Sequence, residues 1–270
     1  MADLEIGVAG CAGRMGQMLL RQIATAAGCV IAGGSEAPGS ATVGLDIGTM
    51  ARLPDTGIPI VDNAEALFET CEAVLDFTTP AATVANAKAA AKQGKILVAG
   101  TTGMTADDEA VLREAAQKTA IVYAANMSVG VNVLAQVVKQ VAALLGPDAF
   151  DIEIVEMHHR NKVDAPSGTA LLLGRAAAEG RGVDLDTVAD RGRDGITGAR
   201  VRGHIGFAAL RGGGVPGDHS VIFASDNERL ELTHRAQDRS LFAAGAVRAA
   251  LWARDKGPGL YDMKDVLGLN

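Results

Sequence analysis

The sequence predicts an α/β protein in two parts, a doubly wound parallel sheet followed by a smaller α+β part with a mixed sheet. Three observations lead to this fold class. Short apolar segments alternate with helical segments through the first half of the chain, as they do in βαβ units. A glycine-rich segment joins the first strand to the first helix. The second half has several β segments at hairpin spacing, which favour antiparallel or mixed pairing.

The first half begins with a predicted strand at 4–9 and a predicted helix at 17–27, whose apolar residues Met18, Leu19 and Ile23 fall on one side. A second strand covers 29–35, and a loop rich in Gly, Pro and Thr follows it. Helices and strands then alternate, with helices at 63–70, 81–93 and 105–119 and strands at 73–77, 96–99 and 121–124. This alternation predicts a parallel sheet.

The second half opens with a long apolar helix at 129–145, and a strand at 151–157 and a helix to about 178 follow it. Residues 180–200 are polar and carry several arginines, so we expect a long irregular segment there. The remaining predicted elements are strands at 204–210, 220–224 and 228–235, a helix at 240–254 and a terminal segment at 260–269. We expect a first domain over 1–128, completed by 239–270, and a second domain over 129–238. Helices should cover one face of the second sheet, which leaves the other face for contact between subunits.

Composition limits the classes of function. The chain has 270 residues and a net charge of −7, which argues against a nucleic-acid partner. No apolar run reaches the roughly 18 residues that a membrane span needs, so we expect no membrane partner. The three cysteines have no metal-binding spacing and suggest reduced thiols. With no signal peptide at the N-terminus, these features predict a cytoplasmic protein.

The glycine-rich segment reads Gly10-Cys11-Ala12-Gly13-Arg14-Met15-Gly16 and lies between a predicted strand and a predicted helix. A dinucleotide-binding fingerprint requires this context. Glycines let the backbone approach a pyrophosphate, and the start of the helix faces its negative charge. An ordinary glycine-rich turn is the alternative. The strand, loop and helix together favour a Rossmann-type cofactor domain.

Glu36 follows the second strand and stands twenty residues after Gly16. An acidic residue at about this distance can bind the hydroxyls of the adenosine ribose. Ala37 and Pro38 come next, so no arginine follows to receive a 2′-phosphate. NADH is therefore favoured, although Arg14 keeps NADPH possible. A solvated carboxylate at the end of a strand is the alternative reading of Glu36.

Three further strands of the first half end in small or hydroxyl-bearing residues. These are Phe77-Thr78-Thr79, Gly100-Thr101-Thr102 and Ala125-Asn126. Open parallel sheets bind ligands at the carboxyl ends of their strands. We expect these loops to line the nicotinamide.

The segment E-M-H-H-R-N-K-V-D-A-P-S-G-T-A at 156–170 gathers titratable and cationic groups before a helix start. His158 and His159 are adjacent and should point to opposite sides of an extended backbone, so they are poor candidates for binding one metal together. No third ligand has a recognisable spacing, and we predict no metal site. A histidine can donate a proton near neutral pH, and Lys162 supplies a positive charge or a second donor. A purely structural histidine is the alternative.

Ser167 is a favourable N-cap for the helix that follows. The backbone N–H groups of Gly168 and Thr169 would then be available to a carboxylate of a ligand. The segment at 156–170 therefore predicts a site for an anionic substrate that accepts a proton.

Several motifs together resemble the dihydrodipicolinate reductase family, also called the 4-hydroxy-tetrahydrodipicolinate reductases, of the diaminopimelate route to lysine. The resemblance covers nearly the whole chain and rests on 8–16, 76–80, 99–103, 124–132, 156–170, 217–223 and 260–269. The segment at 156–170 is highly specific and the glycine segment is not. The resemblance implies NAD(P)H-dependent reduction of 4-hydroxy-tetrahydrodipicolinate to tetrahydrodipicolinate.

The resemblance also implies residue roles. His158 would be the catalytic acid or base, and Lys162 its partnering proton donor. His159, Gly168 and Thr169 would hold the dicarboxylate substrate. The residues implied for cofactor binding are Gly10, Cys11, Ala12, Gly13, Arg14, Met15, Glu36, Gly100, Thr101, Thr102, Ala124, Ala125, Asn126 and Met127. The first domain would bind the dinucleotide, and the second would bind substrate and assemble a homotetramer.

The chain departs from the family pattern at two positions. Ala37 stands where many members have arginine, which puts use of NADPH in doubt, and Met127 stands where many have phenylalanine. Two other functions stay open on the sequence. One is a different two-domain dehydrogenase acting on an aldehyde or amino acid, and the other is a non-catalytic nucleotide-binding sensor.

Overall fold

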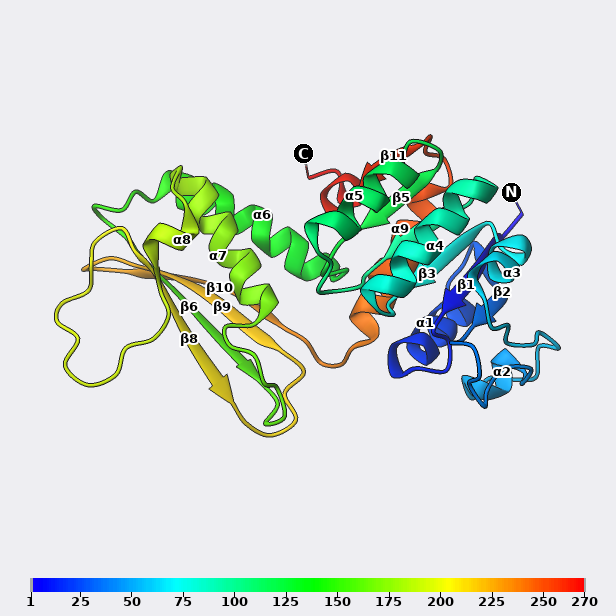
Figure 1. Ribbon diagram of the computed structural model, residues 1–270. Coiled ribbons are helices and arrows are strands. Elements are labelled where there is room, and N and C mark those ends of the chain that lie inside the picture. The colour runs from blue at the N-terminus through cyan, green and yellow to red at the C-terminus, as the bar shows by residue number, and fades with distance from the viewer. Residues whose placement is uncertain (1, 270) are drawn as a thin grey trace. The chain divides into compact units, whose positions relative to one another are not determined.

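The computed structural model describes residues 2–269 and is shown in Figure 1. The chain forms two compact units. The first contains the chain up to Val129 together with the part from Arg239 onward, and the second runs from Gly130 to Asp238. Each unit has a sheet and an apolar core of its own.

The first unit is built on a six-stranded parallel sheet, as the sequence predicts. Its strand order is β11-β5-β4-β3-β1-β2. The strands are β1 (Leu4–Ala9), β2 (Cys29–Ser35), β3 (Ala73–Asp76), β4 (Ile96–Ala99), β5 (Ala120–Tyr123) and β11 (Gly259–Tyr261). All neighbouring strands pair in parallel, so the carboxyl ends of the strands lie at one edge of the sheet.

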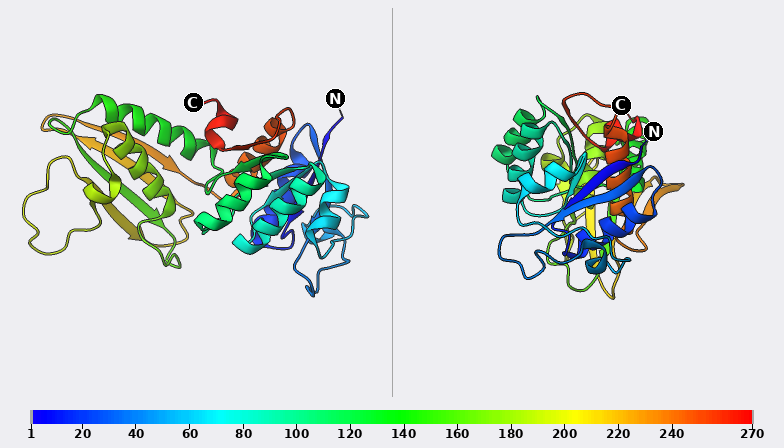
Figure 2. Two further views of the ribbon diagram at one scale, coloured as in Figure 1. Left: turned by 45° about the horizontal axis from the view of Figure 1, so that its top comes forward. Right: turned by 90° about the vertical axis from the view of Figure 1, so that its right-hand side faces the viewer.

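Helices cover both faces of this sheet, which Figure 2 shows in two further views. The helices on one face are α1 (Arg14–Thr25), α9 (Ser240–Ala253) and α10 (Met263–Leu267), and those on the other are α3 (Ala64–Thr70), α4 (Pro80–Gln93) and α5 (Ala106–Ala115). Successive strand residues point to opposite faces. Leu75 therefore packs in the core beneath α1 and α9, whereas Val74 packs beneath α3 and α4.

Two details of the first unit differ from the sequence prediction. Helix α1 begins at Arg14 and not at 17, because Gly13 already acts as its N-cap. The loop over 37–60 contains a short helix, α2 (Ile47–Met50), whose N-cap Asp46 accepts a hydrogen bond from the Thr49 amide. The terminal segment returns to the first sheet as predicted, because β11 pairs with β5.

The second unit has a five-stranded mixed sheet, again as predicted, in the order β10-β9-β6-β8-β7. The strands are β6 (Asp151–His158), β7 (Ala189–Asp190), β8 (Ile205–Arg211), β9 (Asp218–Ala224) and β10 (Arg229–Arg235). The central strand β6 runs parallel to β8 and antiparallel to β9. The helices of this part are α6 (Val129–Leu144), α7 (Gly168–Arg181) and α8 (Leu185–Val188).

The apolar core of the second unit lies between its sheet and the helices α6 and α7. Val138 of α6 and Leu173 of α7 pack with Ile152 and Ile154 of β6. Residues of β6 are buried alternately, and the buried set continues from these isoleucines to Glu156 and His158. The buried face of one strand therefore changes from apolar to ionisable residues at its carboxyl end.

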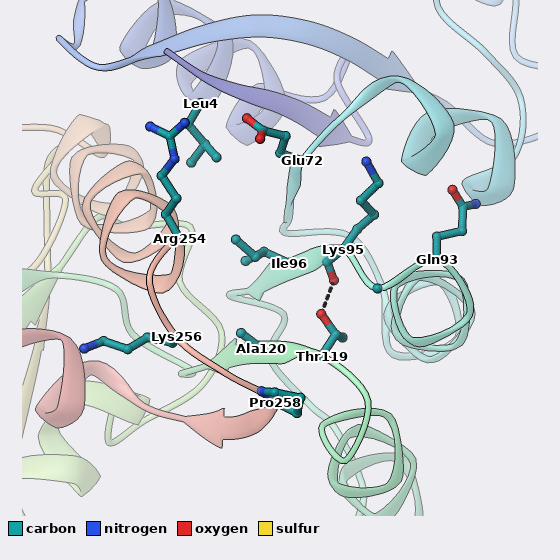
Figure 3. Close-up of a pocket in the computed structure, with 11 residues that line it drawn as sticks. Leu4, Glu72, Gln93, Lys95, Ile96, Thr119, Ala120, Arg254, Lys256 and Pro258 are labelled. Atoms are coloured by element: carbon teal, nitrogen blue, oxygen red, sulfur yellow. Dashed lines mark hydrogen bonds between the residues drawn. The ribbon is translucent and has the colours of Figure 1, made fainter. Parts of the chain in front are cut away.

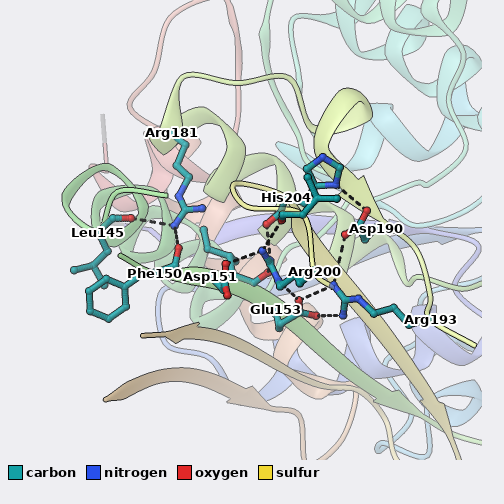
Figure 4. A network of polar contacts seen from close by, with 11 residues as sticks. Leu145, Phe150, Asp151, Glu153, Arg181, Asp190, Arg193, Arg200 and His204 are labelled. Atoms are coloured by element: carbon teal, nitrogen blue, oxygen red, sulfur yellow. Dashed lines mark hydrogen bonds and ion pairs between the residues drawn. The ribbon is translucent and has the colours of Figure 1, made fainter. Parts of the chain in front are cut away.

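The arginine-rich segment predicted at 180–200 is irregular for most of its length, but it contains α8 and the short strand β7. Figure 4 shows that its arginines bind groups of the same unit. Arg193 and Arg200 both donate to the carboxylate of Glu153, and Arg181 donates to the carbonyl oxygens of Leu145 and Phe150. Burial would raise the pKa of Glu153, but these two guanidinium groups lower it. These arginines therefore fasten the segment to the sheet.

Candidate functional site

The glycine loop between β1 and α1 has a backbone that only glycine can form. Gly10 has a φ of +66°, and a Cβ atom at Gly16 would lie 2.1 Å from the carbonyl oxygen of Gly10. Gly13 caps the helix, and within residues 2–269 no side chain bonds to the first turn at this cap. The N–H groups of a first turn have no partner inside the helix. The loop therefore fits the pyrophosphate of a dinucleotide.

Glu36 lies beside this loop, although 24 positions separate it from Ala12. Its Oε1 atom accepts a hydrogen bond of 2.8 Å from the Ala12 amide. The structure thus brings together the loop Gly10–Met15 and the predicted ribose-binding carboxylate. Burial and the charge of Glu36 raise the pKa of the Cys11 thiol to about 12, so this cysteine is neutral and serves packing.

The ends of β3 and β4 form a second part of the same sheet edge. The buried carboxylate of Asp76 accepts hydrogen bonds from Thr78 and from the amide nitrogen of Asn86, at 2.6 to 2.9 Å. Thr101 is also buried, and its hydroxyl lies 2.7 Å from that of Thr83. Thr102 is exposed. Of the two predicted threonines, Thr101 therefore anchors the loop and Thr102 is the more accessible.

The segment after β5 is held by the sheet and by α9. The Ala124 amide donates to the Ala99 carbonyl, and Asn126 Oδ1 accepts from the Ser128 amide. Met127 is only 1% exposed and belongs to the core, where Gly245 of α9 approaches its carbonyl oxygen closely. Met127 is thus part of the core that supports the carboxyl edge of the sheet.

A separate pocket of about 380 Å³ lies at the opposite, amino end of the first sheet and is shown in Figure 3. It is lined by the starts of β1, β4 and β5 and by polar residues such as Glu72 and Arg254. Glu72 accepts from the Glu5 amide, and Arg254 donates to the Ala2 carbonyl. These groups are used within the fold, and the pocket is distinct from the loops at the carboxyl edge.

In the second unit, His158 is held by a buried carboxylate. Glu156 is 1% exposed, and its Oε2 atom lies 2.6 Å from Nδ1 of His158, which is itself 8% exposed. Burial would raise the pKa of Glu156, but hydrogen bonds from Arg211 and His158 lower it, so the group is a carboxylate. A carboxylate can only accept, which places a hydrogen on Nδ1 and leaves Nε2 for proton exchange.

The same carboxylate reaches two other elements. Arg211, at the end of β8, binds it through both Nη atoms at 2.8 and 2.9 Å. The Oε1 atom of Glu156 also accepts a hydrogen bond from the amide of Ser167, at 3.1 Å. Ser167 is the N-cap of α7, because its hydroxyl accepts from the Ala170 amide. Glu156 therefore joins His158 to the helix start that the sequence predicts as a carboxylate-binding site.

His219 of β9 lies against the other side of this group. Its ring meets that of His158 edge to face at 5.1 Å, and its Nε2 atom lies 2.8 Å from the hydroxyl of Ser167. Burial and the nearby charge of His158 lower the pKa of His219 to about 4. His219 is therefore neutral near pH 7 and adds no second positive charge beside His158.

The remaining predicted substrate residues lie in the loop that follows β6. Lys162 forms an ion pair with Asp164, with distances of 2.8 and 2.9 Å, which lowers the pKa of that carboxyl. The His159 amide donates to the Val215 carbonyl, and Arg211 donates to the carbonyl of Asp164. Gly168 is exposed at the start of α7. The loop thus returns to the same strand ends as His158.

Three residues of this group have no assigned role in the sequence prediction. Glu156 could have been found from its spacing, because residues two apart on a strand share a face. Spacing could not link Arg211 and His219 to this group, since they lie 55 and 63 positions after Glu156. Within the described residues, no cluster of His, Cys, Asp and Glu could hold a metal ion, and no helix is long and apolar enough to cross a membrane.

Comparisons with known proteins cover both units. The family models for the N-terminus and the C-terminus of dihydrodipicolinate reductase match residues 4–127 and 130–267. The 4-hydroxy-tetrahydrodipicolinate reductase of Rhodopseudomonas palustris strain BisB18 is 57% identical over 100% of this chain and 99% of its own. The enzyme of the same name from Bradyrhizobium diazoefficiens is 56% identical, with coverage of 100% and 99%.

A solved structure shares the fold. Dipicolinate-bound dihydrodipicolinate reductase from Paenisporosarcina sp. TG-14 superposes with a TM-score of 0.77 at 23% sequence identity, covering 96% of this chain and 97% of that one.

Proposed function

This chain belongs to the dihydrodipicolinate reductase family, and we propose that His158 and Lys162 assist the protonation in the reduction that this family performs. The chain is an oxidoreductase of the diaminopimelate route to lysine, acting on 4-hydroxy-tetrahydrodipicolinate to give tetrahydrodipicolinate. Neither a dehydrogenase of another class nor a binding-only sensor is supported by these relatives.

The observation that carries the proposal is the way in which His158 is held. Glu156 binds Nδ1, so Nε2 is the atom that can give a proton to the substrate. Lys162 adds positive charge toward a dicarboxylate and can act as a second donor. The start of α7, with Gly168 and Thr169, receives one carboxylate of the substrate, and His159 contributes a further contact.

The first unit holds the cofactor in this proposal. The nicotinamide supplies the hydride when bound. Gly10–Met15 and the start of α1 bind the pyrophosphate, Glu36 binds the ribose, and the ends of β4 and β5 border the ring through Gly100–Thr102 and Ala124–Met127. The first domain, 1–128 with 239–270, is thus the dinucleotide-binding part, and 129–238 binds substrate.

The test of His158 uses the condensation product of pyruvate and aspartate semialdehyde as substrate. We expect His158→Gln to lower kcat by about 10²–10⁴-fold, the usual worth of general acid catalysis. His204→Gln is the matched control, because His204 also binds a carboxylate through Nδ1, at 2.8 Å from Asp190, but lies at the opposite end of β8 from Arg211 and His158. A His158→Gln enzyme with the kcat of the wild type would remove His158 from the chemistry.

Glu36 followed by Ala37 supports NADH as the favoured cofactor, with NADPH as the alternative. A carboxylate bonded to the glycine loop repels a 2′-phosphate. The ratio of kcat/KM with NADH to kcat/KM with NADPH should exceed one, and Glu36→Gln should lower this ratio. A strong preference for NADPH in the wild type would contradict this assignment.

We also propose a cytoplasmic homotetramer, assembled through the face of the second sheet that α6 and α7 leave uncovered. Leu210 on that face is 50% exposed, which supports burial of this surface in an assembly. Light scattering of the purified protein should give four chain masses, and a monomer at working concentration would contradict the assembly.

A further inference from the structure

Glu156 is shared between a titratable ring and a permanent cation. Its Oε2 atom accepts both from Nδ1 of His158, at 2.6 Å, and from Nη1 of Arg211, at 2.8 Å. The second Nη atom of Arg211 binds Oε1. The carboxylate is buried, so solvent does little to weaken either interaction. Its negative charge is therefore divided between the two partners.

Glu156 and Arg211 have opposite effects on the protonation of the His158 ring. A carboxylate alone beside an imidazole favours the protonated ring, while a cation near that carboxylate offsets the effect. We propose that Glu156 and Arg211 act as a positioning pair, in which Glu156 orients His158 for proton donation and Arg211 weakens the hold of the carboxylate on the proton. This inference rests on the proposed role of His158.

The other charged groups near His158 do not duplicate this pair. His219 on β9 is neutral near pH 7, and burial also lowers the pKa of His234 on β10. In the following loop, Lys162 is paired with Asp164, and Asp218 begins β9. Of the groups that the structure describes, Glu156 is thus the ion bonded to the His158 ring, and Arg211 is the cation bonded to Glu156.

The pair also fixes the substrate-binding side. Glu156 accepts from the Ser167 amide, and Arg211 donates to the Asp164 carbonyl at 2.6 Å. Replacement of Glu156 should therefore alter the contacts both of the proposed proton donor His158 and of the start of α7. Because these contacts are structural as well, the test needs a readout that a loss of packing would not reproduce.

That readout is the pH dependence of kcat/KM. A proton donor gives a profile that falls as pH rises. We expect Glu156→Gln to move this fall to lower pH and Arg211→Gln to move it to higher pH, each by about one unit. Arg211→Lys keeps the charge and should leave the fall near its wild-type position, although the paired hydrogen bond is lost.

Glu153→Gln is the matched control. Glu153 lies on the same strand and also binds two arginines, Arg193 and Arg200, but it points to the opposite face of the sheet. Its replacement neutralises an arginine-bound carboxylate without touching His158, so kcat/KM should fall at the same pH as in the wild type. Shifts of Glu156→Gln and Arg211→Gln in the same direction, or no shift in either, would overturn the proposal.

A second measurement separates this proposal from the role of His158. Nitrogen NMR of the histidine rings in the cofactor-free protein follows protonation of His158 without activity. The ring should become protonated at lower pH in Glu156→Gln than in the wild type, and at higher pH in Arg211→Gln. If His158→Gln keeps the wild-type kinetic profile, the proposed function fails, while identical ring titrations in all variants would refute the positioning pair.

Discussion

At the scale of single residues, Gly217 is the neighbour of Nε2 of His158, the nitrogen proposed to give the proton. A Cβ atom at this position would lie 2.9 Å from Nε2 of His158, closer than real side chains approach. Glu156 holds the far side of the ring, so the histidine cannot simply move away. The absence of a side chain at 217 therefore keeps Nε2 open.

This contact makes a prediction about Gly217→Ala. The added methyl group should crowd Nε2 and lower kcat by about 10-fold or more, as a partial loss of the roughly 10²–10⁴-fold that general acid catalysis contributes. Gly214→Ala is the matched control, since among the described residues no atom beyond its chain neighbours lies within 4 Å of its Cβ position. Steady-state kinetics and the melting temperature should be measured together. A Gly217→Ala enzyme that is stable and fully active would show that this space is not needed.

The sequence could indicate the proposed proton donor but not its surroundings. His158 and Lys162 stand out because cations and histidines crowd before a helix start. The pairing of Lys162 with Asp164 could not be foreseen, since either carboxylate of that segment was within reach. Arg211 comes from another strand, and only the register of β6 against β8 places it opposite His158.

At the scale of elements, the long periodic segments were predictable and the short ones were not. Strands such as β1 and β2 follow from apolar runs that end at glycine or polar residues. Helix α2 has four residues and strand β7 has two, so neither spans enough chain to show a period. The parallel pairing of the first sheet followed from alternation, but its strand order required the structure.

The buried ring of His219, in the second sheet, makes the free energy of unfolding depend on pH. His219 is neutral in the folded protein because its pKa falls to about 4, whereas an unfolded histidine binds a proton near pH 6.5. Between these values the unfolded state binds more protons, so the free energy of unfolding falls as pH falls. The contribution of His219 to the free energy of unfolding is fully present above about pH 6.5.

Urea unfolding at fixed protein concentration tests this dependence. Between pH 6.5 and 5, one such histidine contributes at most about 1.4 kcal/mol per pH unit. His219→Gln should remove this part of the slope, while His204→Gln, whose ring is 29% exposed and bonded to Asp190, should keep it. An unchanged slope in His219→Gln would show that the buried ring is not the source.

At the scale of the whole molecule, the two units divide the chemistry of the proposed reaction. The first gathers its glycine-bearing and threonine-bearing loops at one edge because all six strands run in the same direction. The second collects ionisable groups at the end of its central strand, where the buried face leaves the apolar core. Each half of the reaction is thus prepared within one compact unit.

The return of the chain to its first unit has a consequence for synthesis on the ribosome. Helix α9 supplies much of the core beneath β1 and β3, and β11 completes the sheet edge beside β5. Neither exists until the chain beyond Arg239 has emerged. The second unit, made earlier and continuous in sequence, can fold first, although domains usually fold in order from the N-terminus. The nascent first unit therefore exposes an apolar face until the segment beyond Arg239 has emerged, which makes it the part that chaperones would have to protect.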